Sequence, residues 1–129
     1  MSDHLNTSEA YAEIQELRGL LSKLIKSLQT HNRRLAKAEY EYRKSLTKTI
    51  FTLNQEGFKG EIDGETFDTN SVAWTASEKI ARGIPEVADL RLERDTLQGE
   101  VDAIMQKIYQ VKTELNLLDN DLQAIRKGD

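Results

Sequence analysis

The chain has 129 residues, no cysteine and one proline, and its formal net charge is −4 at neutral pH. This length allows one domain, and the absence of cysteine excludes disulfides, thiolate zinc sites and a cysteine nucleophile. No uncharged apolar segment approaches the roughly 20 residues that a membrane-spanning helix requires, and the first ten residues lack the features of a secretory signal. We therefore expect a single-domain cytoplasmic protein that does not enter a membrane.

Helix-breaking residues divide the chain into parts. The only proline is Pro85, and four of the seven glycines lie in the middle of the chain. We expect a flexible tail at 1–7, a long helix at 8–56, a connecting segment at 57–84 and a second long helix at 85–127. At 1.5 Å per residue, the two helices would be about 70 Å and about 60 Å long. Two helices of similar length favour an antiparallel hairpin.

Apolar residues of the first long helix repeat with heptad spacing. With Ile14 at position a, eight of the ten a and d residues are apolar or aromatic. These ten positions are Ile14, Leu17, Leu21, Leu24, Leu28, His31, Leu35, Ala38, Tyr42 and Ser45. The apolar stripe then shifts to Leu46, Ile50 and Leu53, as a four-residue stutter would produce.

The second long helix carries a more regular heptad. Eleven of its twelve a and d residues are apolar, and Arg94 is the exception. The twelve positions are Val87, Leu90, Arg94, Leu97, Val101, Ile104, Ile108, Val111, Leu115, Leu118, Leu122 and Ile125. Such patterning over this length indicates a coiled coil. Residues 18–48 carry a net charge of +7 and residues 93–125 a net charge of −4, which favours pairing of the two helices.

Apolar residues beside the heptad positions widen the apolar face of each helix. Leu20 occupies position g and Ile25 position e on the first helix, and Met105 occupies e on the second. A wide face suits a bundle of three or four helices better than an isolated pair. The pattern therefore predicts an all-α fold: a long antiparallel helical hairpin (coiled coil) that dimerises into a four-helix bundle. The alternative is a monomeric hairpin closed by its connecting segment.

The connecting segment combines a turn signal with helix signals. Asp63-Gly64 is typical of a type I′ turn and predicts a short β-hairpin. A short helix is expected over 71–82, with Gly83 at its C′ position and Pro85 in the first turn of the next helix. An isolated two-stranded hairpin is marginal in water, so the segment should pack on the helices. The residues expected to make that contact are Phe58, Phe67 and Trp74.

Residues able to catalyse a reaction or hold a metal form no recognisable set. His31 occupies a d position, where a polar residue fixes register or oligomeric state, and the other histidine, His4, is in the N-terminal tail. No Glu-x-x-His spacing and no Walker A, G-x-G-x-x-G, G-x-S-x-G or H-E-x-x-H motif occurs. We therefore predict no catalytic residue, no metal site and no cofactor, and a protein that is not an enzyme.

The densest basic cluster lies on the first long helix, between residues 33 and 44. It could follow a phosphate backbone or only balance the acidic second helix, and the overall charge of −4 argues against a dedicated nucleic-acid binder. Apolar and aromatic residues that lie off the seam on both helices, such as Tyr40 and Leu92, together with the aromatic residues of the connecting segment, outline possible docking surfaces for a protein partner. The basic residues are Arg33, Arg34, Lys37, Arg43 and Lys44. The residues predicted to bind a partner are Arg33, Arg34, Lys37, Tyr40, Phe58, Phe67 and Trp74.

One segment resembles small coiled-coil proteins encoded by temperate phages of Gram-positive bacteria. In that family an A-R-G turn leads into a long helix with an L-R-x-x-R-D pattern, and residues 81–95 (ARGIPEVADLRLERD) match it. Residues 39–57 are similar to the end of the family's first helix, so the resemblance covers about half the chain. The chain departs from the family by the longer insertion around FKGEIDGETFD. Here Arg91 and Asp95 stand four residues apart, which predicts a local ion pair.

The resemblance implies an early phage product, encoded near single-strand-binding and recombination genes and located in the host cytoplasm. Most members of that family have no assigned activity. The function expected from it is a non-enzymatic interaction protein, which binds a phage recombination or replication protein or inhibits a host defence nuclease. The alternative is an accessory nucleic-acid-binding protein that uses the basic face of the first helix.

Overall fold

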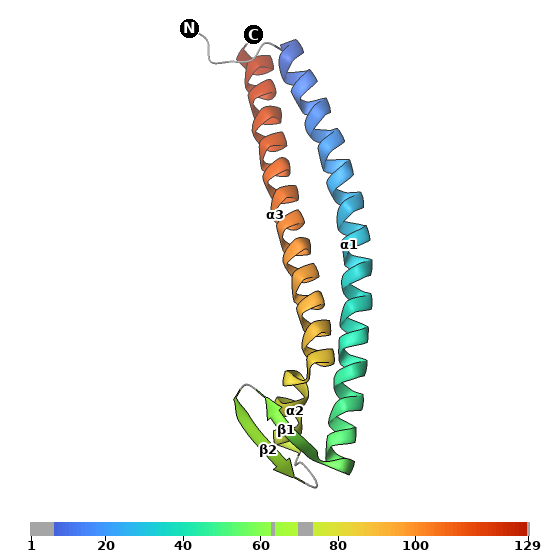
Figure 1. Cartoon of the computed structure of the whole chain (residues 1–129). Helices are drawn as coiled ribbons and strands as arrows, with labels where there is room; N and C mark the ends of the chain where they lie inside the picture. The colour runs from blue at the N-terminus through green and yellow to red at the C-terminus, as the bar shows by residue number, and fades with distance from the viewer. Residues whose placement is uncertain (1–6, 63, 70–73, 129) are drawn as a thin grey trace. The chain divides into compact units, whose positions relative to one another are not determined.

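A computed structural model describes residues 7–62, 64–69 and 74–128 (Figure 1). Helix α1 (Thr7–Glu56) is followed by strands β1 (Phe58–Ile62) and β2 (Glu65–Thr69). Helices α2 (Trp74–Gly83) and α3 (Pro85–Gly128) complete the chain. The protein is predominantly helical, and the prediction of an all-α helical hairpin built on two long helices is confirmed. Most of the predicted N-terminal tail and the predicted start of the short helix at Ser71 lie outside the described residues.

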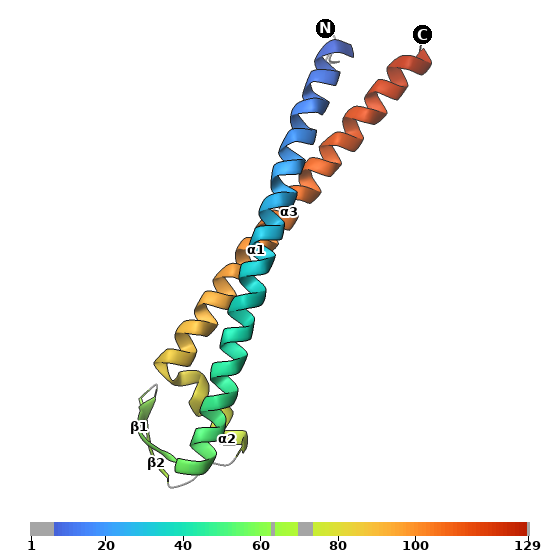
Figure 2. The ribbon, with the colours of Figure 1, turned by 90° about the vertical axis from the view of Figure 1, so that its right-hand side faces the viewer.

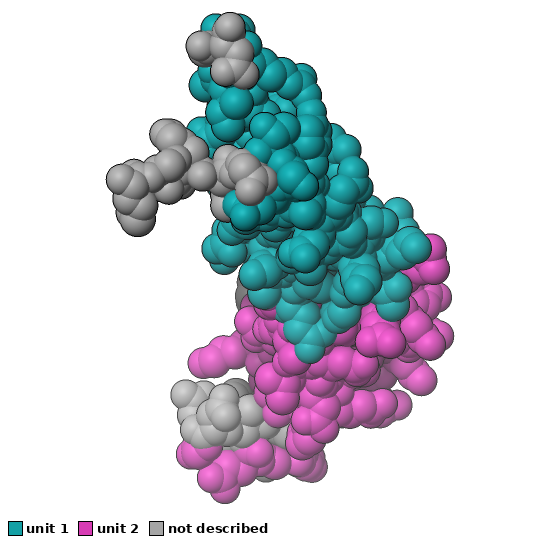
Figure 3. Space-filling model, turned by 90° about the horizontal axis from the view of Figure 1, so that it is seen from above, with its two compact units in different colours: residues 1–32, 100–129 teal, residues 33–99 magenta. Residues whose placement is uncertain are grey.

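Two compact units divide the chain (Figure 3). Unit 1 comprises Met1–Asn32 and Glu100–Asp129, and unit 2 comprises Arg33–Gly99. Each unit contains a stretch of α1 and a stretch of α3, which run antiparallel to each other (Figure 2). Unit 2 also contains the two strands and α2.

The heptad residues form the contact between the helices in both units. Every a and d residue predicted for the two long helices is buried or half-buried. In unit 1 one buried cluster comprises Ala10, Ile14 and Leu122, with Leu115 and Leu118 packed against it. The reason is geometric, because a repeat of 3.5 residues keeps these side chains on one face of each helix. We call the a and d positions together the heptad seam.

Arg94 is the one charged residue at an a position of α3, and an aromatic ring accommodates it. Its guanidinium carbon lies 4.5 Å from the centroid of the Tyr42 ring, which is almost fully buried. The guanidinium also donates to Asp95 at 2.8 Å. A cation over an aromatic face keeps part of its electrostatic stabilisation when water is removed. The predicted ion pair of Arg91 with Asp95 is confirmed, with 3.9 Å between Nε and Oδ2.

A buried cluster of unit 2 lies where the end of α1 meets the C-terminal half of α2. Leu53 packs with Ile80 and Ala81 of α2. The residues around this cluster are Leu46, Ile50 and Ile84. The predicted shift of the apolar stripe after Ser45 is therefore confirmed, since all three residues named for it take part in this core.

The helix ends differ in part from prediction. Gly57, directly after α1, has a φ of 77° and its N–H donates to the Leu53 carbonyl at 2.9 Å. Gly57 therefore takes the left-handed C′ position of α1, whereas the C′ position predicted for the short helix was Gly83. Gly83 instead is the last residue of α2, and the chain enters α3 at once through a bond from the Ile84 N–H to the Ala81 carbonyl at 3.2 Å. The prediction for Gly83 was wrong because α2 and α3 are joined without the reversal that a left-handed residue produces.

Strands β1 and β2 pair antiparallel, and Ile62 lies opposite Glu65. The loop between them therefore has two residues, of which Gly64 has a φ of 81°. A two-residue loop of this kind requires a positive φ, which glycine adopts without the steric cost of a Cβ. The side chains of Phe58, Phe67 and Trp74 lie outside the described residues.

Candidate functional site

The surface of α1 opposite the heptad seam in unit 2 is basic and aromatic. Residues spaced three or four apart over 33–51 lie on this side of the helix and are all exposed. We call them the outer stripe: Arg33, Lys37, Tyr40, Lys44, Thr47, Lys48 and Phe51. Tyr40 is 62% exposed and Phe51 58%, so two aromatic rings of the stripe face solvent. The stripe therefore has four cations and two aromatic rings, and it has no carboxylate.

The four cations of the outer stripe are uncompensated. None makes an ion pair in the part of the chain that the structure describes, including with α3. By contrast, Arg43 beside the stripe is 2.7 Å from Glu39, and Arg82 on α2 is 2.6 Å from Glu78. The Lys44 ammonium lies 5.8 Å from the centroid of the Tyr40 ring, a contact that leaves its charge unpaired. The alternative that these residues only balance the acidic α3 is not supported by their contacts.

A shallow hollow lies on the stripe between its two rings. Its lining consists of Tyr40, Arg43, Lys44, Thr47, Lys48 and Phe51. Because it comes from one helix face, it is open to solvent. Such a surface suits the binding of an extended partner along the helix better than the enclosure of a small molecule.

The predicted partner-binding residues are only partly together. Arg33, Lys37 and Tyr40 lie on the outer stripe. Arg34 is exposed but is turned about 100° around the helix from Arg33, so it lies beside the stripe. Phe51 was not predicted, although its spacing of eleven residues from Tyr40 on a continuous helix is a sequence signal that it shares the same face.

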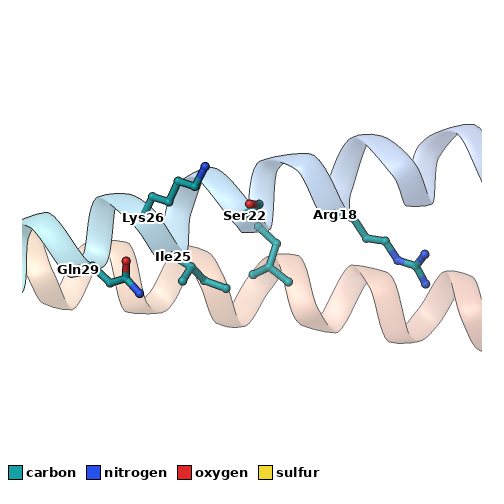
Figure 4. Close-up of a pocket in the computed structure, with 6 residues that line it drawn as sticks. Arg18, Ser22, Ile25, Lys26 and Gln29 are labelled. Carbon is teal, nitrogen blue, oxygen red and sulfur yellow. The ribbon is translucent and has the colours of Figure 1, made fainter.

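A second open hollow lies on the flank of α1 in unit 1 (Figure 4). Its lining includes Arg18, Leu21, Ser22, Ile25, Lys26 and Gln29. Ile25 extends toward α3 in this view, whereas Lys26 turns away from it. Ile25 is 40% exposed and Met105 is 54% exposed, so the residues predicted to widen the seam remain accessible in the single chain.

His31 has partners on both ring nitrogens. Its Nδ1 is 2.8 Å from the Ser27 carbonyl oxygen, and its Nε2 is 3.5 Å from Glu100 Oε2. These contacts hold the ring in the seam and couple α1 to α3 within unit 1. The Ser27 hydroxyl oxygen also lies 3.4 Å from Nδ1. Within the described ranges, no group of three His, Cys, Asp or Glu residues could hold a metal ion.

None of the described helices combines the length and the apolar character needed to cross a bilayer. Comparison with protein-family models, curated proteins and solved structures finds no significant match for this chain. Function is therefore argued from the contacts and charges of the described surface, and the outer stripe is its most distinctive feature.

Proposed function

We propose that this protein is a non-enzymatic interaction protein that binds an anionic partner through the outer stripe. The observation that supports it is the set of four exposed, unpaired cations that surround two exposed aromatic rings without a carboxylate among them. Unpaired like charges on one face repel one another and gain stabilisation when an anion binds. They also raise the rate at which an anionic partner arrives.

The resemblance to phage coiled-coil proteins suggests the setting of this interaction. In the host cytoplasm, the expected partner is a recombination or replication protein of the phage, or a host defence nuclease that the protein inhibits. The alternative partner is a nucleic acid, which would bind the same basic face of α1. No bound group is needed for either role, since the stripe acts by contact.

We propose in addition that two copies of the chain associate into a four-helix bundle. The support is the flank formed by Ile25 and Met105 at e positions, which are 40% and 54% exposed. Burying such side chains contributes roughly 25 cal/mol per Å² of apolar surface. A second copy would cover this flank and leave the outer stripe free, because the stripe lies opposite the seam on α1.

Binding of simple polyanions tests the proposed function. The full chain is titrated at 50 mM salt with a labelled 15-residue polyglutamate and a labelled 15-nucleotide oligothymidylate, with polylysine as the cationic control. We expect binding of at least one polyanion and none of polylysine. The double variant K37E/K44E should lose this binding, whereas K23E/K107E, which changes the net charge equally at exposed lysines of unit 1, should keep it. Failure of both polyanions to bind, or equal loss in both variants, would refute the proposal.

A further inference from the structure

We infer that the outer stripe binds single-stranded nucleic acid, with bases stacked on Tyr40 and Phe51 and phosphates held by the four cations. This inference rests on the proposed function and names the chemical class of its partner. Proteins that bind single strands without sequence preference combine cations that follow the backbone with aromatic rings on which bases stack. The outer stripe contains both kinds of group on one helix face.

The dimensions of the stripe suit an extended strand. Its ends, Arg33 and Phe51, are about 27 Å apart along the helix, and its two rings are about 16 Å apart, at 1.5 Å per residue. Lys44 lies between the rings, Lys48 lies one turn before Phe51, and Lys37 lies one turn before Tyr40. Each ring therefore has a cation within one helical turn, so a base on the ring and its phosphate could be bound together.

The rings favour a single strand over a duplex. In a duplex the faces of the bases are covered by their neighbours, so an exposed Tyr or Phe on a protein surface gains no stacking there. Tyr40 and Phe51 are more than half exposed and project from one straight helix face, where they can meet bases that are not stacked. A duplex would use the cations alone.

The same surface fits an acidic protein less well. The cores of protein interfaces are depleted in charged residues, and lysine is among the depleted types. The centre of the outer stripe is Lys44, and Thr47 and Lys48 lie between it and Phe51, so side chains with polar ends separate the two rings along the helix. A protein partner would have to bury lysines to reach either ring.

The overall charge of −4 does not oppose this inference, because the relevant charge is local. The screening length of ionic interactions is about 8–10 Å in physiological salt, and the stripe itself contains no carboxylate over about 27 Å. The nearest acidic neighbour with a described contact, Glu39, is paired with Arg43. Glu41 is exposed at the edge of the stripe, but it is one carboxylate against four cations, so a strand on the stripe would meet a net positive charge.

Fluorescence anisotropy with the intact chain tests the inference, with 15-nucleotide oligothymidylate, a 15-base-pair duplex and 15-residue polyglutamate as probes. We expect the single strand to bind tightest. With four phosphates contacted, the slope of log K against log salt should be about −3, which is about a 50-fold loss between 50 and 200 mM salt. Replacing Tyr40 or Phe51 with alanine should weaken binding about 5- to 150-fold each.

The matched control is Y109A, because Tyr109 is 73% exposed on α3 of unit 1, away from the stripe in sequence and unit. It should leave the affinity unchanged, and circular dichroism should show equal helicity in all variants. Equal weakening by Y109A, or a duplex bound as tightly as the single strand, would overturn the inference. Binding of polyglutamate without oligothymidylate would overturn it and leave the proposed function standing. Binding of neither polyanion would overturn both.

Discussion

Truncation of Leu53 compared with truncation of Phe51 tests the placement of the outer stripe. These residues are two positions apart on α1, yet Leu53 is 3% exposed and Phe51 is 58% exposed. Leu53→Ala removes three carbon atoms from the contact with Ile80 and Ala81. At about 0.8 kcal/mol for each buried methylene the transfer loss is about 2.4 kcal/mol. The remaining cavity brings the expected loss of unfolding free energy to about 3 kcal/mol.

Phe51→Ala should change the free energy of unfolding by less than about 0.5 kcal/mol, because surface substitutions cost little and alanine has the higher helix propensity. The assay is urea unfolding followed by circular dichroism at 222 nm, with the same slope expected for both variants. Equal losses for the two variants would mean that Phe51 is buried in solution. That result would refute the assignment of Phe51 to an exposed face, and with it the outer stripe.

Three further predictions concern the seam, the α1–α2 contact and the flank. His31→Leu should raise the free energy of unfolding by about 1 kcal/mol, because an apolar residue replaces a polar one in the seam; a lower urea midpoint would contradict this. Ser77 is fully buried and its Oγ donates to Asn54 Oδ1 at 2.7 Å. Ser77→Ala should lower the free energy of unfolding by about 1–3 kcal/mol, because the Asn54 acceptor loses its donor. Adding Asn54→Leu should recover most of this loss, because it removes that acceptor. Light scattering should give twice the chain mass of 14.7 kDa, and I25E/M105E should return it to one chain with unchanged helicity; a wild-type mass of one chain would refute the dimer.

The seam could be predicted from the sequence because its cause is local and periodic. A helix of constant pitch places residues by their spacing alone, so apolar residues at a and d must share a face, and burial of that face stabilises the pair. All the predicted a and d positions are buried or half-buried. They include His31 and Arg94, although a polar side chain by itself does not indicate burial. The signal at Pro85 was equally local, and α3 starts at this residue.

The outer stripe could be predicted only in part from the sequence. The basic cluster is evident in the sequence. The side of α1 that is buried decides which residues of the cluster lie together on the exposed side. Phe51 was missed because an apolar residue near the end of an amphipathic helix is expected to be buried. After the stutter, Leu53 meets α2, and this contact turns Phe51 toward solvent.

The sequence by itself determined the two long helices, the residues of the seam and the acidic and basic character of each helix, because spacing and composition act over a few residues. Only the tertiary structure decided how Arg94 is accommodated and that Ser77 and Asn54 are joined across 23 residues. It also decided which cations remain unpaired. These features depend on contacts between residues distant in the chain, and the pattern of residues along one helix does not show which residues pack against that helix.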